Sequence, residues 1–130
     1  MNKDSLDYNN LSGMKESLLV KKLPMYTVII KQFPLALQQI ANRSIYGHKK
    51  YELYDHDWMN FKRVPDAVNE YQEATIRHLM NIGPETPYEH LIAAAWNLLA
   101  IIQIKEEEII EHKEKENASR NKQQQNIMEQ

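Results

Sequence analysis

The chain contains no cysteine and only three glycines, and it carries no excess of positive charge. Without cysteine it can form neither a disulfide nor a thiolate metal site, and this composition suits a reducing compartment. The formal net charge of -2 argues against a general nucleic-acid-binding protein, because such proteins usually carry a basic face. Few glycines, together with 42% hydrophobic and 26% charged residues, indicate a helical globular protein.

Targeting signals and long hydrophobic runs are also missing. The polar residues 1–10 do not resemble a signal peptide. The longest apolar run, Leu91–Ile102, is interrupted by Asn97 and is too short to cross a bilayer. We therefore expect a soluble, cytoplasmic protein without a membrane partner. A chain of 130 residues can form one domain with a real core but not two.

Composition divides the chain into an arm, one helical domain and a tail. Residues 1–22 show no steady period and predict a loosely ordered, extended N-terminal arm, whereas residues 23–112 predict a single domain. Met25–Ile30 is aromatic and β-branched, and we expect an extended segment packed on helices rather than an isolated strand. The polar residues 113–130 predict a charged and disordered tail.

Turn and capping signals predict three helices in the domain. They cover residues 33–46, residues 65–82 and a segment from Thr86 into the 110s. Gly47 is expected to stop the first helix and Gly83–Pro84 the second. Residues 48–63 predict a loop of about sixteen residues, a length that is more often functional than idle. Residues 91–104 are apolar on nearly every side, so the third helix is either the centre of the domain or part of a subunit interface.

Two glutamates on the second helix are candidate metal ligands. Glu70 and Glu73 are three residues apart, so their carboxylates project from neighbouring positions. Helical bundles hold divalent cations with such carboxylates and others from a facing helix, and Mg²⁺ is the natural ion where phosphates bind. The alternative is a solvated acidic face with a local ion pair between Glu73 and Arg77.

Three polar residues fall on apolar helix faces. His90 and Asn97 are seven residues apart and share one stripe of the third helix, while His78 lies on the apolar side of the second helix. Buried polar groups need partners, so we expect His78 to face this stripe. A purely structural hydrogen-bond network remains an alternative. So does a zinc site on His78 and His90, although no third ligand has diagnostic spacing.

Cations and flat aromatic rings occur together around the predicted loop. Lys49 and Lys50 suit phosphate as point charges, and Arg77 could bind phosphate through two nitrogens. Tyr51 or Trp58 could stack on a base. The alternative is that these aromatic residues only pin the loop to the core. The sequence contains no phosphate-binding glycine loop, nucleophilic triad or dinucleotide fingerprint.

An ordered set of short motifs resembles the dATP/dGTP diphosphohydrolase N-terminal-type domain, a family found often in bacteriophages. The motifs are YGHKKY at 46–51, DW at 57–58, EATIRHL at 73–79, PET at 84–86, HL at 90–91 and AWNL at 95–98. The resemblance extends roughly from Pro24 to Ile104. It implies an all-α, MazG-like helical bundle with a long central helix, assembled as a homo-oligomer that is a dimer or larger.

The resemblance also implies an activity. The expected enzyme is a Mg²⁺-dependent pyrophosphohydrolase that cuts dATP or dGTP between the α- and β-phosphates, giving the monophosphate and pyrophosphate. Its partner is a nucleotide rather than a nucleic-acid polymer, in the host cytoplasm if the protein is phage-encoded. The predicted site has four groups: catalytic Glu70, Glu73, His78 and His90; metal-binding Glu70, Glu73, Glu85 and Glu89; phosphate-binding Lys49, Lys50 and Arg77; and base-binding Tyr51, Trp58 and Asn97.

Two positions depart from the family pattern and keep other functions open. Gly83 replaces a usual aspartate, and Ala93 replaces a usual second histidine. A site short of a carboxylate binds Mg²⁺ less well, so the second hypothesis is a protein that sequesters a nucleotide or a cyclic nucleotide signal without turnover. Such a protein could counter host immune signalling for a phage. The third hypothesis is a helical adaptor whose third helix only mediates assembly.

Overall fold

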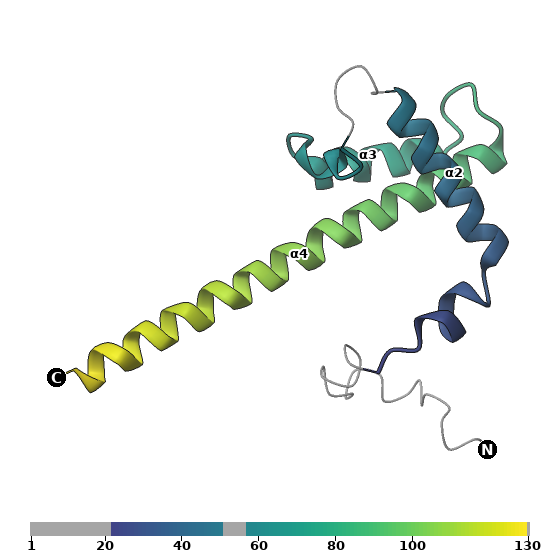
Figure 1. The fold of residues 1–130 in the computed structure, drawn as a ribbon. Coiled ribbons are helices and arrows are strands. Elements are labelled where there is room, and N and C mark those ends of the chain that lie inside the picture. Colours follow the sequence, from purple (N-terminus) through teal and green to yellow (C-terminus); the bar gives the residue numbers. More distant parts are fainter. Residues whose placement is uncertain (1–21, 51–56, 130) are drawn as a thin grey trace. The chain divides into compact units, whose positions relative to one another are not determined.

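The computed structural model describes residues 22–50 and 57–129, and these residues form an all-α fold (Figure 1). The elements follow in the order η2 (Tyr26–Ile30), α2 (Pro34–Lys50), η3 (Asn60–Arg63), α3 (Ala67–Leu79) and α4 (Pro87–Met128). No strand occurs within the described ranges. The prediction of an all-α fold is therefore confirmed, and the longest of the described helices is the C-terminal α4.

The chain separates into two compact units, Met1–Leu37 and Gln38–Gln130, and each is described by itself. In the first unit, Tyr26–Ile30 forms a short π-helix, so the prediction of an extended segment is wrong. The backbone N–H of Lys31 donates to the carbonyl of Tyr26 at 2.7 Å. β-Branched residues favour extended backbone when a pleated neighbour is present, and without one the chain satisfies its backbone groups within a helical turn. The predicted arm lies outside the described residues up to position 21.

Helix α2 continues through Gly47 to Lys50, so the prediction that Gly47 ends it is wrong. Gly47 does not adopt a positive φ. A helical glycine costs only about 1 kcal/mol relative to alanine, which the continuing backbone hydrogen bonds offset. The predicted loop 48–63 is correspondingly shortened at its start, and η3 occupies its last residues.

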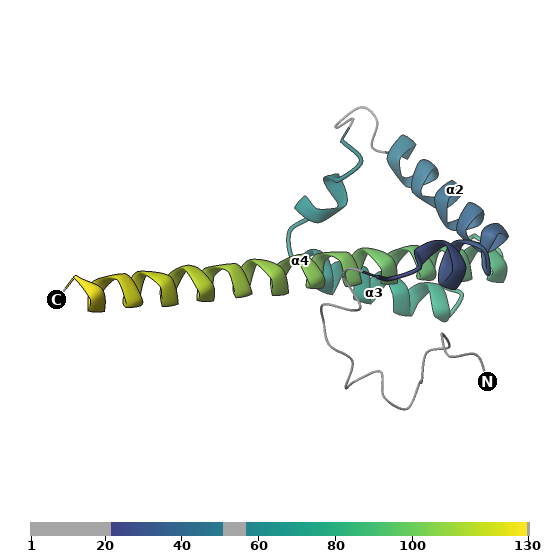
Figure 2. The ribbon, with the colours of Figure 1, turned by 60° about the horizontal axis from the view of Figure 1, so that its bottom comes forward.

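Helices α3 and α4 pack against each other along the whole of α3 (Figure 2). Small side chains fill the seam between them: Ala67, Ala93, Ala94 and Ala100 are all buried. Because alanine projects so little, two helix axes can approach toward the lower end of the usual spacing of about 8–10 Å. The core of this unit is therefore a narrow alanine contact rather than a cluster of large aliphatic residues.

Trp96 of α4 connects η3 to this helix pair. Its ring meets those of Phe61 and Tyr71 edge to face, with centroids 5.8 Å away in each case. Such aromatic pairs contribute about 0.5–1.5 kcal/mol beyond the area they bury. The hydroxyl of Tyr71 also donates to the carbonyl of Phe61 at 2.8 Å. These contacts join η3 to both long helices.

A left-handed asparagine ends α3. Asn81 has a φ of 57°, and its backbone N–H donates to the carbonyl of His78 at 3.0 Å. The N–H of Ile82 donates to the carbonyl of Arg77, also at 3.0 Å. Together these bonds form a Schellman motif, which satisfies carbonyls that the helix end would leave unpaired. The prediction that Gly83 ends this helix is wrong, because Asn81 performs that task earlier.

Thr86 starts α4, as the sequence predicts. Its hydroxyl oxygen accepts a hydrogen bond from the backbone N–H of Glu89 at 3.2 Å, and Pro87 occupies the first helical position. Threonine caps the free N–H groups of a first turn, and proline there loses no hydrogen bond. Only residues 80–86 separate α3 from α4. This short connection brings the end of α3 beside the start of α4.

Helix α4 continues through residues 113–128, for which the composition predicts disorder. This part is exposed, and side-chain pairs one turn apart stabilise it locally. Lys115 lies 3.1 Å from Glu111, and His112 lies 3.1 Å from Glu116. Each such pair stabilises a helix by a few tenths of a kcal/mol. Local pairs among good helix formers thus stabilise helix where no core is available.

Large apolar side chains remain on the surface of α4. Leu91, Leu98 and Ile102 are each about half exposed or more, with exposed fractions of 57%, 47% and 57%. Among the described residues, no helix combines the length and the apolar character needed to span a membrane. A soluble monomer rarely leaves such a stripe uncovered.

Candidate functional site

His78 and His90 meet where α3 turns into α4. His78 is the penultimate residue of α3 and His90 is the fourth residue of α4, so the short connection places them opposite each other. Their Nδ1 atoms are 2.8 Å apart, and the imidazole rings are tilted by 49°. One ring donates this hydrogen bond and the other accepts it. The expectation that His78 faces the stripe of His90 is confirmed.

Glu85 completes a cluster with the two histidines. Its Oε2 atom lies 3.7 Å from Nδ1 of His90. Of all the histidine and acidic side chains in the described ranges, only His78, Glu85 and His90 form a group of three with ligand atoms within 4.8 Å of one another. We call this group the His–Glu–His cluster. Helical spacing could not identify Glu85 as the third member, because it lies in the turn and on neither helix.

Arg43 of α2 faces the other carboxylate oxygen. Its Nη2 atom is 3.9 Å from Oε1 of Glu85, and both side chains are about three-quarters buried. The guanidinium also lies 4.9 Å from the ring centroid of Tyr46. The two oxygens of Glu85 thus serve different neighbours, Oε1 toward Arg43 and Oε2 toward His90. Sequence reasoning missed Arg43, since no motif distinguishes it from other surface cations.

His90 is the most deeply buried member. Its side chain is fully enclosed, and its Nε2 atom has no hydrogen-bond partner. An unpaired buried polar atom costs about 1–3 kcal/mol of stability. Asn97, two turns further along the same stripe, is also buried. A buried imidazole with one nitrogen that lacks a hydrogen-bond partner lowers stability. Such costs are typical of functional sites.

The protonation states of His78 and Glu85 suit metal binding. Burial lowers the pKa of His78 below its ordinary value of 6.5, and the positive charge of Arg43 lowers it further. The backbone N–H of Glu85 itself, and then the nearby imidazoles, lower the pKa of the Glu85 carboxyl below 4.5. At neutral pH the cluster therefore presents a neutral imidazole on His78 and an ionised carboxylate on Glu85, the forms that bind metals.

Gly83 lies directly beside the cluster. Its φ is +124°, a conformation that other residues adopt only under strain. A Cβ atom at this position would lie 2.9 Å from Oε2 of Glu85 and 3.4 Å from Cε1 of His90. The turn therefore requires glycine here for its backbone conformation, and the absence of a Cβ also lets the Glu85 carboxylate approach closely.

The other predicted metal ligands lie outside the His–Glu–His cluster. Glu70 and Glu73 are exposed on α3, and Glu89 is exposed on the first turn of α4. They do not join Glu85 in any acidic group that the described residues form. In the same part of the chain no ion pair links Glu73 to Arg77, which is also exposed. The described residues therefore do not bring Glu70, Glu73 and Glu89 together with Glu85, and their role as metal ligands stays a prediction.

The predicted basic and aromatic group is described only in part. Lys49 is exposed near the end of α2, and Trp58 stacks on His48 with ring centroids 4.0 Å apart and planes 11° apart. Trp58 keeps 54% of its surface exposed, so it is not pinned in the core. Tyr51 and the side chain of Lys50 lie outside the described residues. Their assignment to base and phosphate stays a prediction, as does that of Asn97.

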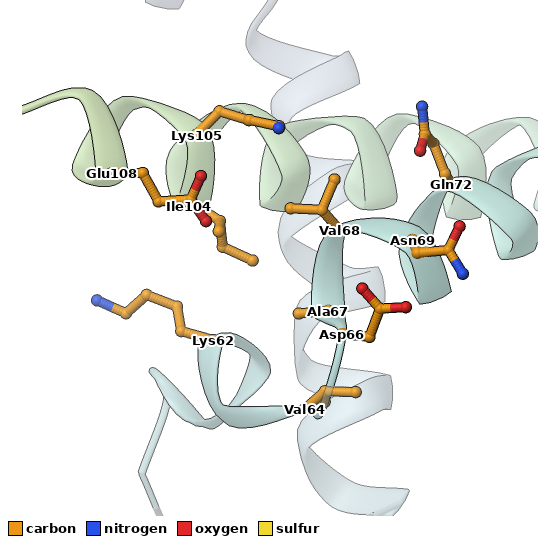
Figure 3. Close-up of a pocket in the computed structure, with 10 residues that line it drawn as sticks. All are labelled: Lys62, Val64, Asp66, Ala67, Val68, Asn69, Gln72, Ile104, Lys105 and Glu108. Carbon is orange, nitrogen blue, oxygen red and sulfur yellow. The ribbon is translucent and has the colours of Figure 1, made fainter. Parts of the chain in front are cut away.

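A separate cavity of about 480 Å³ lies between η3, the first turn of α3 and the middle of α4 (Figure 3). Its lining consists of Lys62, Val64, Asp66, Ala67, Val68, Asn69, Gln72, Ile104, Lys105 and Glu108. None of the predicted site residues is among them, and Lys62 already pairs with Glu107 at 3.0 Å. Ala67 and His78 are eleven residues apart on α3, which is about 16 Å along a helix. This cavity is therefore distinct from the His–Glu–His cluster.

Comparison with known proteins places the chain in a family. No curated protein and no solved structure matches it. The family profile described as dATP/dGTP diphosphohydrolase, N-terminal, matches residues 13–116, which include both histidines and Glu85. The match covers most of the chain. The chain therefore belongs to the dATP/dGTP diphosphohydrolase N-terminal family.

Proposed function

We propose that this protein is a metal-dependent diphosphohydrolase. In this proposal it cleaves dATP or dGTP between the α- and β-phosphates and releases the monophosphate and pyrophosphate. Family membership supports the reaction class. The single observation that carries the location is the His–Glu–His cluster, in which two imidazoles and a carboxylate converge at the α3–α4 turn.

A divalent metal ion bound at such a site would activate water and neutralise charge that develops on phosphate. The residues of the chain hold the metal ion and position the substrate. Glu85 and the two histidines provide ligand atoms, and Arg43 orients the Glu85 carboxylate through Oε1. The planar guanidinium of Arg43 also suits a phosphate oxygen that enters beside Glu85. The phosphates of the nucleotide would supply further oxygen ligands to a metal ion held by the cluster.

The basic and aromatic residues outside the cluster have proposed roles in substrate binding. Lys49 and Arg77 are exposed and free of the cluster, and each can meet the outer phosphates as a cation. The exposed face of Trp58 can stack on a purine, and its other face is supported by His48. Stacking of this kind is worth about 1–3 kcal/mol per base in single-strand-binding proteins, so loss of Trp58 is expected to raise KM more than it lowers kcat.

Product analysis on a nucleotide panel tests the proposal. The purified chain is incubated with each dNTP and with Mg²⁺, Mn²⁺ or Zn²⁺, and chromatography separates monophosphate, diphosphate and pyrophosphate. We expect monophosphate and pyrophosphate from dATP and dGTP. Absence of both products with every metal, from a protein that has a native circular dichroism spectrum, contradicts the proposal.

Two glutamate variants locate the reaction. Glu85→Gln keeps the shape of the side chain but removes its charge, and we expect it to abolish turnover. Glu73→Gln is the matched control, because Glu73 is an exposed glutamate on α3 outside the cluster. The opposite result, loss of turnover in Glu73→Gln alone, would move the metal site to the exposed acidic face that the sequence predicts.

Binding without turnover is the second candidate function. It is favoured by the presence of one carboxylate rather than several in the cluster, since Mg²⁺ prefers oxygen ligands. In this case the chain sequesters a nucleotide or a cyclic dinucleotide. Calorimetric binding with recovery of intact ligand after denaturation supports it, and product formation in the same sample excludes it.

We also propose that the protein assembles as a homo-oligomer through α4. Apolar residues that are not buried recur along it at spacings of three and four up to Ile102, and again seven residues later: Tyr88, Leu91, Ala95, Leu98, Ile102 and Ile109. This spacing is the seam of a coiled coil, and it lies on a different side of α4 from the buried Ala93 and Ala100. Light scattering tests the proposal. Ile102→Glu is expected to give a monomer. Ile127→Glu, near the end of the same helix, should leave the mass of the oligomer unchanged. A parent chain that is already monomeric refutes the proposed assembly.

A further inference from the structure

We propose that His78, Glu85 and His90 form a resident site for a first-row transition metal, with Zn²⁺ as the best-matching ion, that is occupied without nucleotide. This inference deepens the proposed function because it concerns the same cluster. It does not require turnover, however, since a metal can bind to a site that performs no hydrolysis.

The ligand atoms of the His–Glu–His cluster determine which class of metal ion it binds best. The cluster offers two imidazole nitrogens and one carboxylate oxygen. Mg²⁺ binds almost entirely through oxygen and keeps several waters, whereas imidazole suits Zn²⁺ and its transition-metal neighbours. Two histidines with one glutamate are also a known ligand set of catalytic zinc, which leaves the fourth position open for water or substrate. A site of this composition is expected to select Zn²⁺ over Mg²⁺ by orders of magnitude.

The distances are close to those a metal needs. Nitrogen and oxygen ligands about 2.0–2.1 Å from a tetrahedral zinc are about 3.3 Å from one another. The Nδ1 atoms of His78 and His90 are 2.8 Å apart, and Oε2 of Glu85 is 3.7 Å from Nδ1 of His90. These two separations each differ from that value by about half an ångström, and all three ligand atoms lie within 4.8 Å of one another. The helices hold both imidazoles, and Arg43 holds the far oxygen of Glu85, so little reorganisation is required.

Two further observations indicate that the cluster is built for a ligand. Nε2 of the fully buried His90 has no partner, so the hydrogen bond to His78 leaves this ring incompletely satisfied, and either ring nitrogen of His90 is available as the ligand atom. Gly83 lets the turn approach the cluster closely, since a Cβ there would lie 2.9 Å from Oε2 of Glu85 and 4.0 Å from Nε2 of His90. The backbone of the turn thus lies beside both the carboxylate and the unpaired edge of the imidazole. A structural hydrogen bond between two histidines requires neither the carboxylate nor the glycine.

Direct metal binding tests the inference without any nucleotide. The full chain is stripped with a chelator, dialysed, and titrated with Zn²⁺ in a calorimeter, and bound metal is counted by mass spectrometry of the elements. We expect one Zn²⁺ per chain, and we expect excess Mg²⁺ not to displace it. Substitution with Co²⁺ should give the strong visible absorption of a four-coordinate ion. No zinc binding by the folded chain, or displacement of zinc by millimolar Mg²⁺, overturns the inference.

Variants separate the cluster from adventitious surface binding. His78→Ala and Glu85→Gln are expected to weaken Zn²⁺ binding by at least about 10–100-fold, the loss seen even when groups behind a ligand are removed. His90 is fully buried, so its substitution is avoided. The control is His112→Ala, because His112 lies with Glu116 on the exposed part of α4 and could bind zinc weakly. Loss of stoichiometric zinc in His112→Ala but not in His78→Ala overturns the inference.

The outcomes for metal and for hydrolysis are independent. Tight zinc binding that depends on Glu85, without product from any dNTP, supports the resident metal site and refutes the proposed reaction. Hydrolysis with Mg²⁺ by a chain that binds no zinc supports the reaction and refutes the resident site. Circular dichroism of each variant verifies the fold in both experiments.

Discussion

Gly83→Ala is the substitution whose effect the structure determines most directly. Gly83 has a φ of +124°, in a region that alanine occupies only under strain. Its new Cβ would also meet Oε2 of Glu85 at 2.9 Å. That oxygen is the end of a flexible side chain and can move aside at small cost. The substitution therefore has two separable effects, namely backbone strain, which lowers stability, and displacement of the Glu85 carboxylate, which disturbs the His–Glu–His cluster.

The expected loss of stability follows from the backbone. A residue other than glycine in such a sparsely populated region costs about 1–3 kcal/mol. Replacement of glycine by alanine returns about 0.4–1 kcal/mol, because the unfolded chain loses freedom. The net loss in the free energy of unfolding is thus about 1–2 kcal/mol. For a unit the size of Gln38–Gln130, each kcal/mol corresponds to a fall of roughly 4–8 °C in Tm.

Thermal and denaturant unfolding of the metal-free chain, followed by circular dichroism, measure this effect. Gly47→Ala is the matched control, because a Cβ at Gly47 meets nothing within 4 Å and the residue is helical. That change is expected to stabilise α2 by about 0.5–1 kcal/mol, whereas Gly83→Ala is expected to destabilise the chain. A Gly83→Ala protein with unchanged or higher Tm would refute the strain argument. Unchanged zinc affinity in the same protein would show that the Glu85 carboxylate is not displaced.

Three further predictions concern single contacts. Thr86→Ala removes the cap of α4 and should lower the free energy of unfolding by about 0.5–2 kcal/mol in urea titrations, while Thr86→Ser should retain most of it. Tyr71→Phe removes the hydrogen bond to the carbonyl of Phe61 and should cost about 0.5–1.5 kcal/mol, and an equally stable variant would show that the bond contributes nothing net. Burial and then the charge of Arg43 lower the pKa of His78 in the folded chain, so the unfolded chain binds more protons just below pH 6.5. The free energy of unfolding of the metal-free protein should therefore fall as the pH drops below 6.5. An NMR titration should place the midpoint of His78 below 6.5 and show a higher midpoint in Arg43→Gln, and an unshifted midpoint in that variant contradicts the electrostatic part of the argument.

Local signals in the sequence predict most of the helical framework. The Thr86–Pro87 pair predicts the start of α4, because capping and proline placement depend only on neighbouring residues. Periodicity places His78 on the apolar side of α3 and His90 on that of α4, which is sufficient to expect the two rings to meet. Where two neighbouring residues both carry a helix-stop signal, the sequence does not show which of them ends the helix. Gly83 carries the usual stop signal for α3, yet the left-handed residue that closes the helix is Asn81.

The third member of the cluster could not be derived in the same way. Glu70 and Glu73 have the regular spacing that sequence reasoning associates with metal ligands, but they point from an exposed face of α3. Glu85 has no periodic relation to His78 or His90, because it lies in the turn between their helices. Arg43 is distant in the chain and has no signal other than its charge.

Composition, capping residues and helical periodicity thus specify an all-α chain whose two central helices bear facing histidines, because each of these properties acts over a few residues. Which carboxylate joins the histidines depends on how tightly the chain turns after α3, and hence on the backbone conformations of Asn81 and Gly83. The approach of Arg43 to Glu85 likewise depends on packing between segments remote in sequence. Tertiary structure alone decides these contacts, since no interaction between near neighbours encodes the distance between a turn and a separate helix.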